Sequence, residues 1–250
     1  MSESHLPGWR WDGKRDVYEG LPEKDHEWPI TLDQARSWLL GQENQFRIQQ
    51  HLERYLTSYD GRFFEHFVLK SERRQFTPWD VLAAESLSVT VPARAINRLI
   101  DGHEVREAVG AILDSLMPGR DALWTCDDAL LKGDKNALDT SGALFRLYYI
   151  LRSRDIGIGP VTTSKLLAAK FPNVVPIRDS RVEALLDISP EENWWIAIRE
   201  LLSPQLVDHL DGLIRPDRVP YVSTLRRLDI ILWMEAIARG VSSRRSVKED

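Results

Sequence analysis

Closely spaced prolines are the feature of this sequence that most limits its fold. Proline has no backbone N–H and cannot continue the interior of a helix, so each one tends to end an element or begin the next. The prolines that bound short segments are Pro92, Pro118, Pro172, Pro190, Pro204 and Pro220. Within these segments apolar residues recur at helical spacing, and convincing strand-like alternation is absent. The sequence therefore predicts an all-α fold built as a compact bundle of short helices.

The apolar periodicity also predicts where the helices lie. One or two amphipathic helices should follow Thr31, and "TPWD" predicts a further start with Thr77 as N-cap and Pro78 as the first helical residue. The other predicted helices are 79–89, 92–100, 103–115, 140–154, 160–170, 180–187, 191–202, 204–214 and 222–239.

The two ends of the chain differ from this helical part. Residues 1–30 are rich in Pro, Gly, Trp and charge without a sustained period, so we expect an irregular arm. That arm could pack against the rest through Trp9, Trp11 and Trp28. Residues 31–240 are predicted to form a single helical domain, and residues 241–250 a frayed tail.

Composition excludes several classes of protein. Apolar residues make up 43% of the chain and charged residues 28%, as in an ordinary soluble globular protein. No apolar run is long enough to span a bilayer, and the first residues hold no apolar core of a signal peptide. One cysteine, Cys126, excludes an intramolecular disulfide and a cysteine-built metal cluster, and the six histidines show no metal-binding spacing. We therefore expect a cytoplasmic protein with no membrane partner and no catalytic metal.

Charge is distributed unevenly along the chain. The formal net charge is −5, yet residues 142–182 carry seven Lys or Arg against only Asp155 and Asp179. A locally basic strip in an acidic chain can face phosphate groups; the alternative is that the long cationic side chains simply solvate two helices. The counts alone leave both interpretations open.

The stretch "DIGIGPVTTSKLLAAKFPNVVPIRDSRV" is the part of the chain that suggests a functional site. Gly157 and Gly159 permit positive φ and a close approach of the backbone to a ligand, and Pro160 suits the first position of the next helix. Turn amides and a helix N-terminus together form a binding site for phosphate, which fixes position without reading base sequence. The alternative is a tight corner between two helices with nothing bound.

The order of hairpin, apolar segment and acid resembles the helix-hairpin-helix DNA glycosylase superfamily. In that family a "GVG-x-x-TA" hairpin precedes an extended "V-D-T-H-V" segment that carries the catalytic aspartate. The matching positions here are Gly157, Ile158, Gly159, Thr162 and Thr163 for the hairpin, then Asp179, Ser180 and Val182 for the acid segment. The resemblance is clear only from Gly142 to Leu186, with the helix-hairpin-helix at 142–170 and the acid segment at 174–187.

This resemblance implies a function and a set of site residues. The implied fold is a two-lobed helical bundle, and the implied protein is a monomer that binds double-stranded DNA, flips a base and hydrolyses its N-glycosidic bond. Asp179 would be the catalytic carboxylate. The phosphate contacts would come from Gly157, Ile158, Gly159, Val161, Thr162 and Lys165. No cofactor is implied, apart from a monovalent cation that the hairpin could hold.

The chain departs from the family's pattern at three points. Bifunctional members place a Schiff-base lysine where this chain has Val161, so the resemblance implies base removal without strand cleavage. Lys165, one turn further on, is the nearest substitute, and we expect it to be solvated. No iron–sulfur cluster can form with one cysteine, and Arg181 replaces the family's histidine near the acid. Such a glycosylase could attack hypermodified phage bases, such as glucosylated hydroxymethylcytosine, as antiviral defence.

Other candidate contacts lie on both sides of the hairpin. Tyr149 is the better exposed of two adjacent tyrosines and could stack on an extruded base, and Arg178, Ser180 and Arg181 flank the acid. A wedge that fills the gap in the duplex could come from Arg73, Arg74 and Gln75, although a solvated turn with Phe76 buried fits this loop better.

Two other functions fit the sequence. Asp179 suits the N-cap of the helix that follows, so the chain could be a helix-hairpin-helix DNA-binding protein without catalysis. A helical protein–protein scaffold that binds no nucleic acid is the third interpretation. Our prediction is the first: a monofunctional DNA glycosylase.

Overall fold

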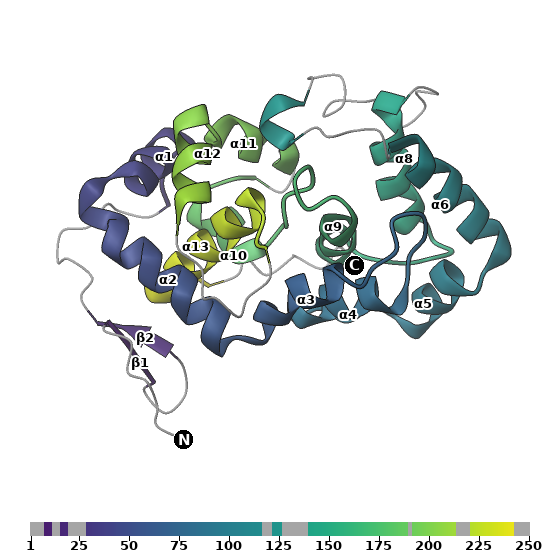
Figure 1. The fold of residues 1–250 in the computed structure, drawn as a ribbon, viewed down its shortest axis with the longest axis horizontal. Helices are drawn as coiled ribbons and strands as arrows, with labels where there is room; N and C mark the ends of the chain where they lie inside the picture. The colour runs from purple at the N-terminus through teal and green to yellow at the C-terminus, as the bar shows by residue number, and fades with distance from the viewer. Residues whose placement is uncertain are drawn as a thin grey trace.

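The computed structural model describes residues 8–11, 16–19, 29–116, 122–126, 140–189, 192–213 and 221–242. The predictions for Trp28 and for most of the tail lie outside these residues, as does the side chain of Trp11. Within them the chain is mostly helical (Figure 1), so the all-α prediction is confirmed. A two-lobed bundle and a helix-hairpin-helix remain predictions.

The described helices are spread over both halves of the chain. The first half of the chain contains α1 (Leu32–Leu40), α2 (Gln45–Ser58), α3 (Phe64–Val68), α4 (Pro78–Ser86), α5 (Ala93–Ile100) and α6 (His103–Leu116). The second half contains α8 (Thr140–Leu151), α9 (Pro160–Lys170), α10 (Ser180–Leu185), α11 (Trp194–Leu201), α12 (Pro204–Gly212) and α13 (Thr224–Ala238). Short 3₁₀ turns lie at Gln42–Asn44, Asp60–Phe63 and Leu123–Thr125.

Prolines and capping residues set the helix starts, as the sequence predicts. The prolines in first turns are Pro78 in α4, Pro160 in α9 and Pro204 in α12. At α4 the backbone N–H of Thr77 donates to Asp80 Oδ2 at 2.7 Å, which confirms the predicted N-cap. Prolines and short polar side chains therefore fix where several of the helices begin, and the helices themselves are held by burial of their apolar sides.

The N-terminal arm is not irregular throughout. β1 (Trp9–Trp11) and β2 (Asp16–Tyr18) pair antiparallel, with Trp9 opposite Tyr18. The Trp9 and Tyr18 rings lie 5.3 Å apart, and each lies 5.5 Å from the ring of buried His51 on α2. The prediction of an irregular arm is wrong here because this cross-strand aromatic pair buries its rings on α2. The predicted packing of Trp9 is confirmed.

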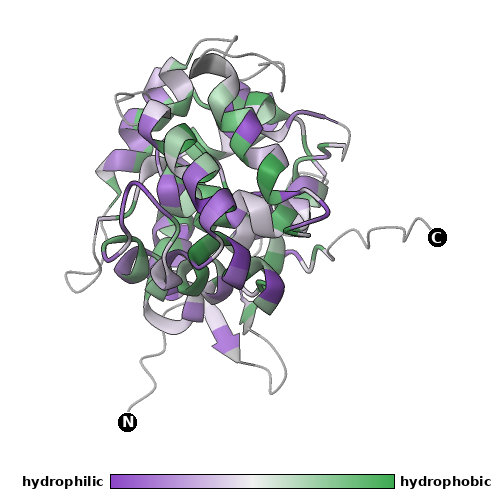
Figure 2. Ribbon diagram, turned by 90° about the vertical axis from the view of Figure 1, so that its right-hand side faces the viewer, coloured by the Kyte–Doolittle hydropathy of each residue, from purple (hydrophilic) through white to green (hydrophobic). Residues whose placement is uncertain are grey.

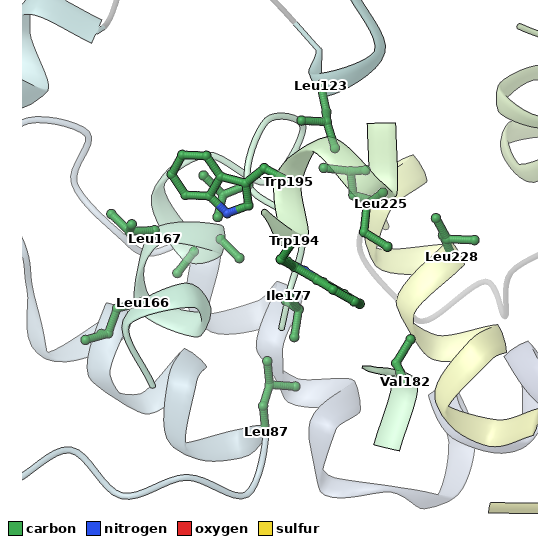
Figure 3. Close-up of a cluster of buried hydrophobic side chains, with 14 of the residues drawn as sticks. Leu87, Leu123, Leu166, Leu167, Ile177, Val182, Trp194, Trp195, Leu225 and Leu228 are labelled. Carbon is green, nitrogen blue, oxygen red and sulfur yellow. The ribbon is translucent and has the colours of Figure 1, made fainter. Parts of the chain in front are cut away.

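One large cluster of buried apolar side chains joins helices from both halves of the chain. Single helices carry both hydrophobic and hydrophilic residues (Figure 2), as expected for elements buried on one side. Trp194 and Trp195 leave α11 in different directions (Figure 3): Trp194 points toward Ile177 and Val182, and Trp195 toward the side of α9. This packing fixes the segment between α9 and α10 against α11 and α13.

Helix α9 occupies the middle of the molecule. In Figure 1 it lies between the group formed by α1, α2 and α10–α13 and the group formed by α5, α6 and α8. It packs on α3, α4 and α8, while α10 packs on α13. Among the described residues, no helix has the length and apolar character required to cross a bilayer.

Candidate active site

The connection between α8 and α9 is a tight turn that contains the two glycines. Its amides point back to α8: Gly157 N–H donates to Ser153 O at 2.7 Å, and Ile158 N–H to Leu151 O at 3.3 Å. Gly157 has φ of +71°, whereas Gly159 has φ of −71° and an extended backbone. The positive φ that both glycines would permit is therefore used only at Gly157.

At Gly159 neither the backbone conformation nor the packing calls for glycine. A Cβ atom there would meet nothing within 4 Å, so the chain itself does not require a glycine at this position. Pro160 follows in the first turn of α9, where backbone N–H groups have no partner inside the helix. Ile158 is buried and anchors the turn, while Val161 and Thr162 are half-buried. The surface beside Gly159 is thus open at a helix N-terminus, which is a suitable place for an anion.

Asp179 lies directly before α10 and acts as its N-cap. Its Oδ1 accepts the backbone N–H of Arg181 at 2.9 Å, so the capping role read from the sequence is confirmed. Its other oxygen, Oδ2, lies 3.8 Å from Nζ of Lys165. The carboxyl side chain retains 20% exposure. One oxygen therefore holds the backbone while the other faces a cavity.

That cavity, here called the acid cavity, has a volume of about 440 Å³. Its lining comes from α2, the turn before α3, the connection between α4 and α5, the middle of α9, the start of α10 and α13. The lining residues are Tyr55, Tyr59, Asp60, Gly61, Ser86, Leu87, Ser88, Lys165, Ile177, Asp179, Ser180, Arg181, Arg226, Asp229 and Trp233. A pocket of this size is in the range that holds small-molecule ligands.

Lys165 is the residue whose environment differs most from the prediction. Its side chain is 5% exposed, so the expectation of a solvated lysine is wrong. Nζ donates to the carbonyl of Leu87 at 2.7 Å and faces the acid cavity rather than the glycine turn. Burial lowers the pKa of Lys165, and the carboxylates of Asp179 and Asp229 partly oppose that shift. The resemblance implied that Lys165 contacts phosphate, whereas its amine lies beside the carboxylate of Asp179.

A second carboxylate, Asp229, lines the same cavity. It comes from α13, keeps only 9% of its side-chain exposure and forms an ion pair with Arg226. Burial raises the pKa of Asp229 to about 6, and the neighbouring Asp179 adds to this rise, while Arg226 and Lys165 oppose it. Our sequence reasoning missed this residue. The available signal was the presence of charged residues inside the otherwise apolar run "LRRLDIILWM".

Arg226 connects the acid cavity to the core. Its guanidinium lies 3.2 Å from Glu65, donates to the Tyr55 hydroxyl at 2.8 Å and donates to the Gly61 carbonyl at 3.1 Å. With Asp229 added, one buried cation serves two carboxylates. A network of this kind fixes the positions of its members, because breaking it would leave a charge buried without a partner.

Aromatic side chains form one wall of the acid cavity. Tyr55 and Tyr59 stack with ring centroids 5.4 Å apart, and Trp233 meets both rings edge-on at 5.6 and 5.3 Å. These rings were not predicted as site residues because they come from helices far apart in sequence. Ser88, which also lines the cavity, adopts φ of +61°, a conformation that non-glycine residues rarely use, and it directly follows Leu87, whose carbonyl accepts Lys165 Nζ.

The remaining candidate residues line two different cavities. Ser180 and Arg181 line the acid cavity with Asp179, and the guanidinium of Arg181 donates to Val241 O at 3.2 Å. Arg178 and Tyr149 instead line a second cavity formed by α8 and α11. Tyr149 is 46% exposed, so the predicted exposure is confirmed, but its ring is not among the residues of the acid cavity.

The loop before α4 lies at the other end of α9 from the glycine turn. Lys170, the last residue of α9, donates to Ser71 Oγ at 2.7 Å and pairs with buried Asp80 at 2.8 Å. Since an eleven-residue helix is about 16 Å long, the loop with Arg73, Arg74 and Gln75 is far from the turn. The exposed Arg74 pairs with Asp114, and Gln75 with Glu72 and Arg106. Phe76 is buried, as the alternative interpretation of this loop expected.

The basic residues between positions 142 and 182 are only partly exposed. Arg152 and Arg154 are exposed and both follow the end of α8, next to the glycine turn. Lys165 and Lys170 are buried in ion pairs. Cations that can meet phosphate are therefore concentrated at the turn. Among the described residues, no three His, Cys, Asp or Glu side chains are grouped so as to bind a metal ion.

Comparison with known proteins places this chain in a family without assigning it an activity. Residues 48–236 match the sequence profile of DUF6308, which is described as a family of unknown function. The chain belongs to this family. The match includes every residue that lines the acid cavity and excludes the N-terminal β-hairpin. No curated protein and no solved structure gives a significant match.

Proposed function

We propose that this protein is a monofunctional DNA glycosylase. The observation that carries the proposal is the position of Asp179: one carboxylate oxygen faces a cavity with aromatic walls, and the acid follows an open glycine turn by about twenty residues. Both features flank α9, the turn at its N-terminus and the acid beside Lys165 in its middle. One rigid helix can therefore hold a phosphate grip and a carboxylate at a fixed separation.

The proposed chemistry uses the carboxylate of Asp179. As the bond between base and sugar breaks, positive charge develops on the sugar ring, and a carboxylate near C1′ stabilises that charge. Asp179 Oδ2 is free of the capping bond, so it can also orient or accept a proton from the attacking water. The proton goes to Asp179, the hydroxyl goes to the sugar, and the electrons of the glycosidic bond leave with the base.

The other residues of the acid cavity would hold the flipped base. Tyr55, Tyr59 and Trp233 offer ring surface on which a base can stack. A carboxylate such as Asp229 accepts hydrogen bonds from an exocyclic amino group, which is how acidic side chains recognise cytosine. These features favour a cytosine or adenine derivative, and among cytosine derivatives a hypermodified phage base remains our proposal for the substrate. Antiviral defence would be the corresponding role.

The backbone of the DNA should stay intact. Val161 stands where related enzymes carry a Schiff-base lysine. Lys165 is the lysine that lines the acid cavity, and its ammonium is held by Leu87 O and Asp179. Borohydride added during the reaction should therefore trap no covalent adduct. An adduct that forms in wild type and disappears in Lys165→Met would contradict the monofunctional part of the proposal.

The test is mass spectrometry of free bases released from a panel of duplex DNAs. The panel contains plain, alkylated, deaminated, oxidised and phage-modified DNA, and the protein is used at full length. We expect release of one class of modified base together with alkali-labile abasic sites. Release from none of these DNAs would contradict the glycosylase function.

A DNA-binding protein without catalysis is the second candidate function. The observation that favours it is the full set of structural contacts of Asp179, which caps α10 and pairs with Lys165. This candidate expects duplex binding that weakens steeply with salt and no base release from any substrate.

A further inference from the structure

A second cavity lies beside the glycine turn and is separate from the acid cavity. Its volume is about 250 Å³, and it is formed mainly by the last turns of α8 and the start of α11. Phe145, Tyr148 and Tyr149 come from α8 and Trp195 from α11, and two arginines, Arg152 and Arg178, also line it. We call it the aromatic cavity.

A thin wall of backbone separates the two cavities. On α9, Ser164 lines the aromatic cavity while the next residue, Lys165, lines the acid cavity. After α9, Arg178 lines the aromatic cavity, while Ile177 and Asp179 on either side of it line the acid cavity. This alternation is the pattern of an extended segment, whose successive side chains point to opposite sides. Ser164 Oγ accepts the Arg178 N–H at 2.8 Å and so ties the wall to α9.

The aromatic cavity is built to receive a planar group. Trp195 packs against Phe145 with centroids 4.8 Å apart and meets Tyr148 nearly perpendicular at 5.9 Å. Tyr149 meets Tyr148 nearly perpendicular at 5.8 Å and is 46% exposed, so ring surface remains at the rim. The rings are thus held in place by one another, and the exposed ring of Tyr149 offers a surface for stacking.

Positive charge stands at the rim of the same cavity. The guanidinium carbon of Arg152 lies 5.3 Å from the Tyr148 ring centre, and Arg152 is exposed. Arg152 also lies one residue beyond the end of α8, at the start of the connection that leads into Gly157. Stacking rings beside an arginine are how proteins bind the bases and backbone of single-stranded nucleic acid. The exposed carboxylate of Glu192, which lines the cavity as well, can accept a hydrogen bond from the edge of a base, while Asn193 Oδ1 caps α11.

We propose that the aromatic cavity binds one unpaired base of DNA, stacked at Tyr149, with its phosphate at Arg152. A strand whose phosphate contacts the open surface at Gly159 would pass this cavity, because α8 leads directly into that turn. Asp179 does not line the cavity, so a base held here is positioned and not excised. The inference rests on the DNA-binding part of the proposed function and is independent of base removal.

The test measures binding of a fluorescently labelled short oligothymidylate by anisotropy, with the full-length protein and several variants. Because base–aromatic stacking is worth about 1–3 kcal/mol per base, Tyr149→Ala should weaken binding about 5- to 150-fold. Tyr149→Phe keeps the ring and should bind as wild type does. Arg152→Ala should weaken binding and reduce its salt dependence. Tyr221→Ala is the matched control, since Tyr221 is 61% exposed and lines neither cavity.

Several results would overturn this inference. They are absence of oligothymidylate binding in wild type, unchanged affinity in Tyr149→Ala, and equal losses in Tyr149→Ala and Tyr221→Ala. Cross-linking with an iodouracil-substituted oligomer gives a second readout that does not depend on variant stability. We expect cross-links to α8 or α11, and cross-links confined to other helices would also overturn it. Binding with this pattern but without base release would contradict the glycosylase and leave the inference standing.

Discussion

Replacing Asp229 by Asn should change how the stability of the protein depends on pH. The native protein raises the pKa of Asp229 from the ordinary 3.8 to about 6, chiefly through burial. The folded state therefore binds this proton more tightly than the unfolded state, and stability falls as pH rises between these two values. A shift of about 2.2 pKa units at about 1.4 kcal/mol per unit corresponds to roughly 3 kcal/mol. Asparagine cannot ionise, so this loss should be absent from the variant.

The assay is urea unfolding of wild type and Asp229→Asn at a series of pH values, followed by circular dichroism. The free energy of unfolding of wild type minus that of the variant should fall by about 2.4 kcal/mol between pH 4 and 7, the rest of the roughly 3 kcal/mol being lost below pH 4. Most other titrating groups are common to both proteins and cancel in the difference. A difference that stays constant, or that rises with pH, would refute the reasoning. A constant difference would mean that the attraction of Arg226 balances burial and the repulsion of Asp179, and a rising one that it outweighs them.

Three further predictions concern α9 and its surroundings. Gly157→Ala should lower the free energy of unfolding by about 1–2 kcal/mol, because the φ of Gly157 is left-handed. Gly159→Ala should lower it by less than about 0.5 kcal/mol and yet weaken DNA binding. Equal losses for the two variants in urea unfolding would contradict this difference. Lys170→Met should lower the free energy of unfolding, measured in urea, by about 3–5 kcal/mol, because it leaves Asp80 buried without its cation. A loss below about 1 kcal/mol would be inconsistent with a buried ion pair. Lys165→Met should raise the pKa of Asp229 further, because the Lys165 ammonium opposes the rise that burial causes. NMR titration of the side-chain carboxyl carbon measures this pKa. An unchanged pKa would count against a cavity shared by Lys165 and Asp229.

Much of the fold could be predicted because local signals specify these helices. Pro160 and Pro204 begin α9 and α12, and Thr77 with Asp80 begins α4, as the sequence pattern indicates. The N-terminal hairpin could not be predicted, because its strands have three residues each and depend on the packing of Trp9 and Tyr18 against His51. A contact between distant segments of this kind leaves no periodic trace in the sequence.

The candidate site was predictable only where its residues are close in sequence. Gly157, Gly159 and Asp179 lie within one short stretch and could be identified together. Asp229 and Trp233 reach the acid cavity from α13, and only folding brings them to Asp179. The burial of Lys165 was missed because helical spacing does not show which polar residue faces an internal cavity. The separation of Tyr149 from Asp179 into different cavities has the same origin.

The most direct test of the account compares wild type with Asp179→Asn on a DNA substrate that releases a base. Asparagine can still accept the Arg181 N–H through its amide oxygen, so the N-cap and the fold should persist. We expect the variant to bind this DNA with unchanged affinity and to leave no alkali-labile abasic sites in a single-turnover reaction. Asp208→Asn on the exposed side of α12 is the matched control and should release the base as wild type does. Base release by Asp179→Asn at the wild-type rate would contradict the catalytic assignment.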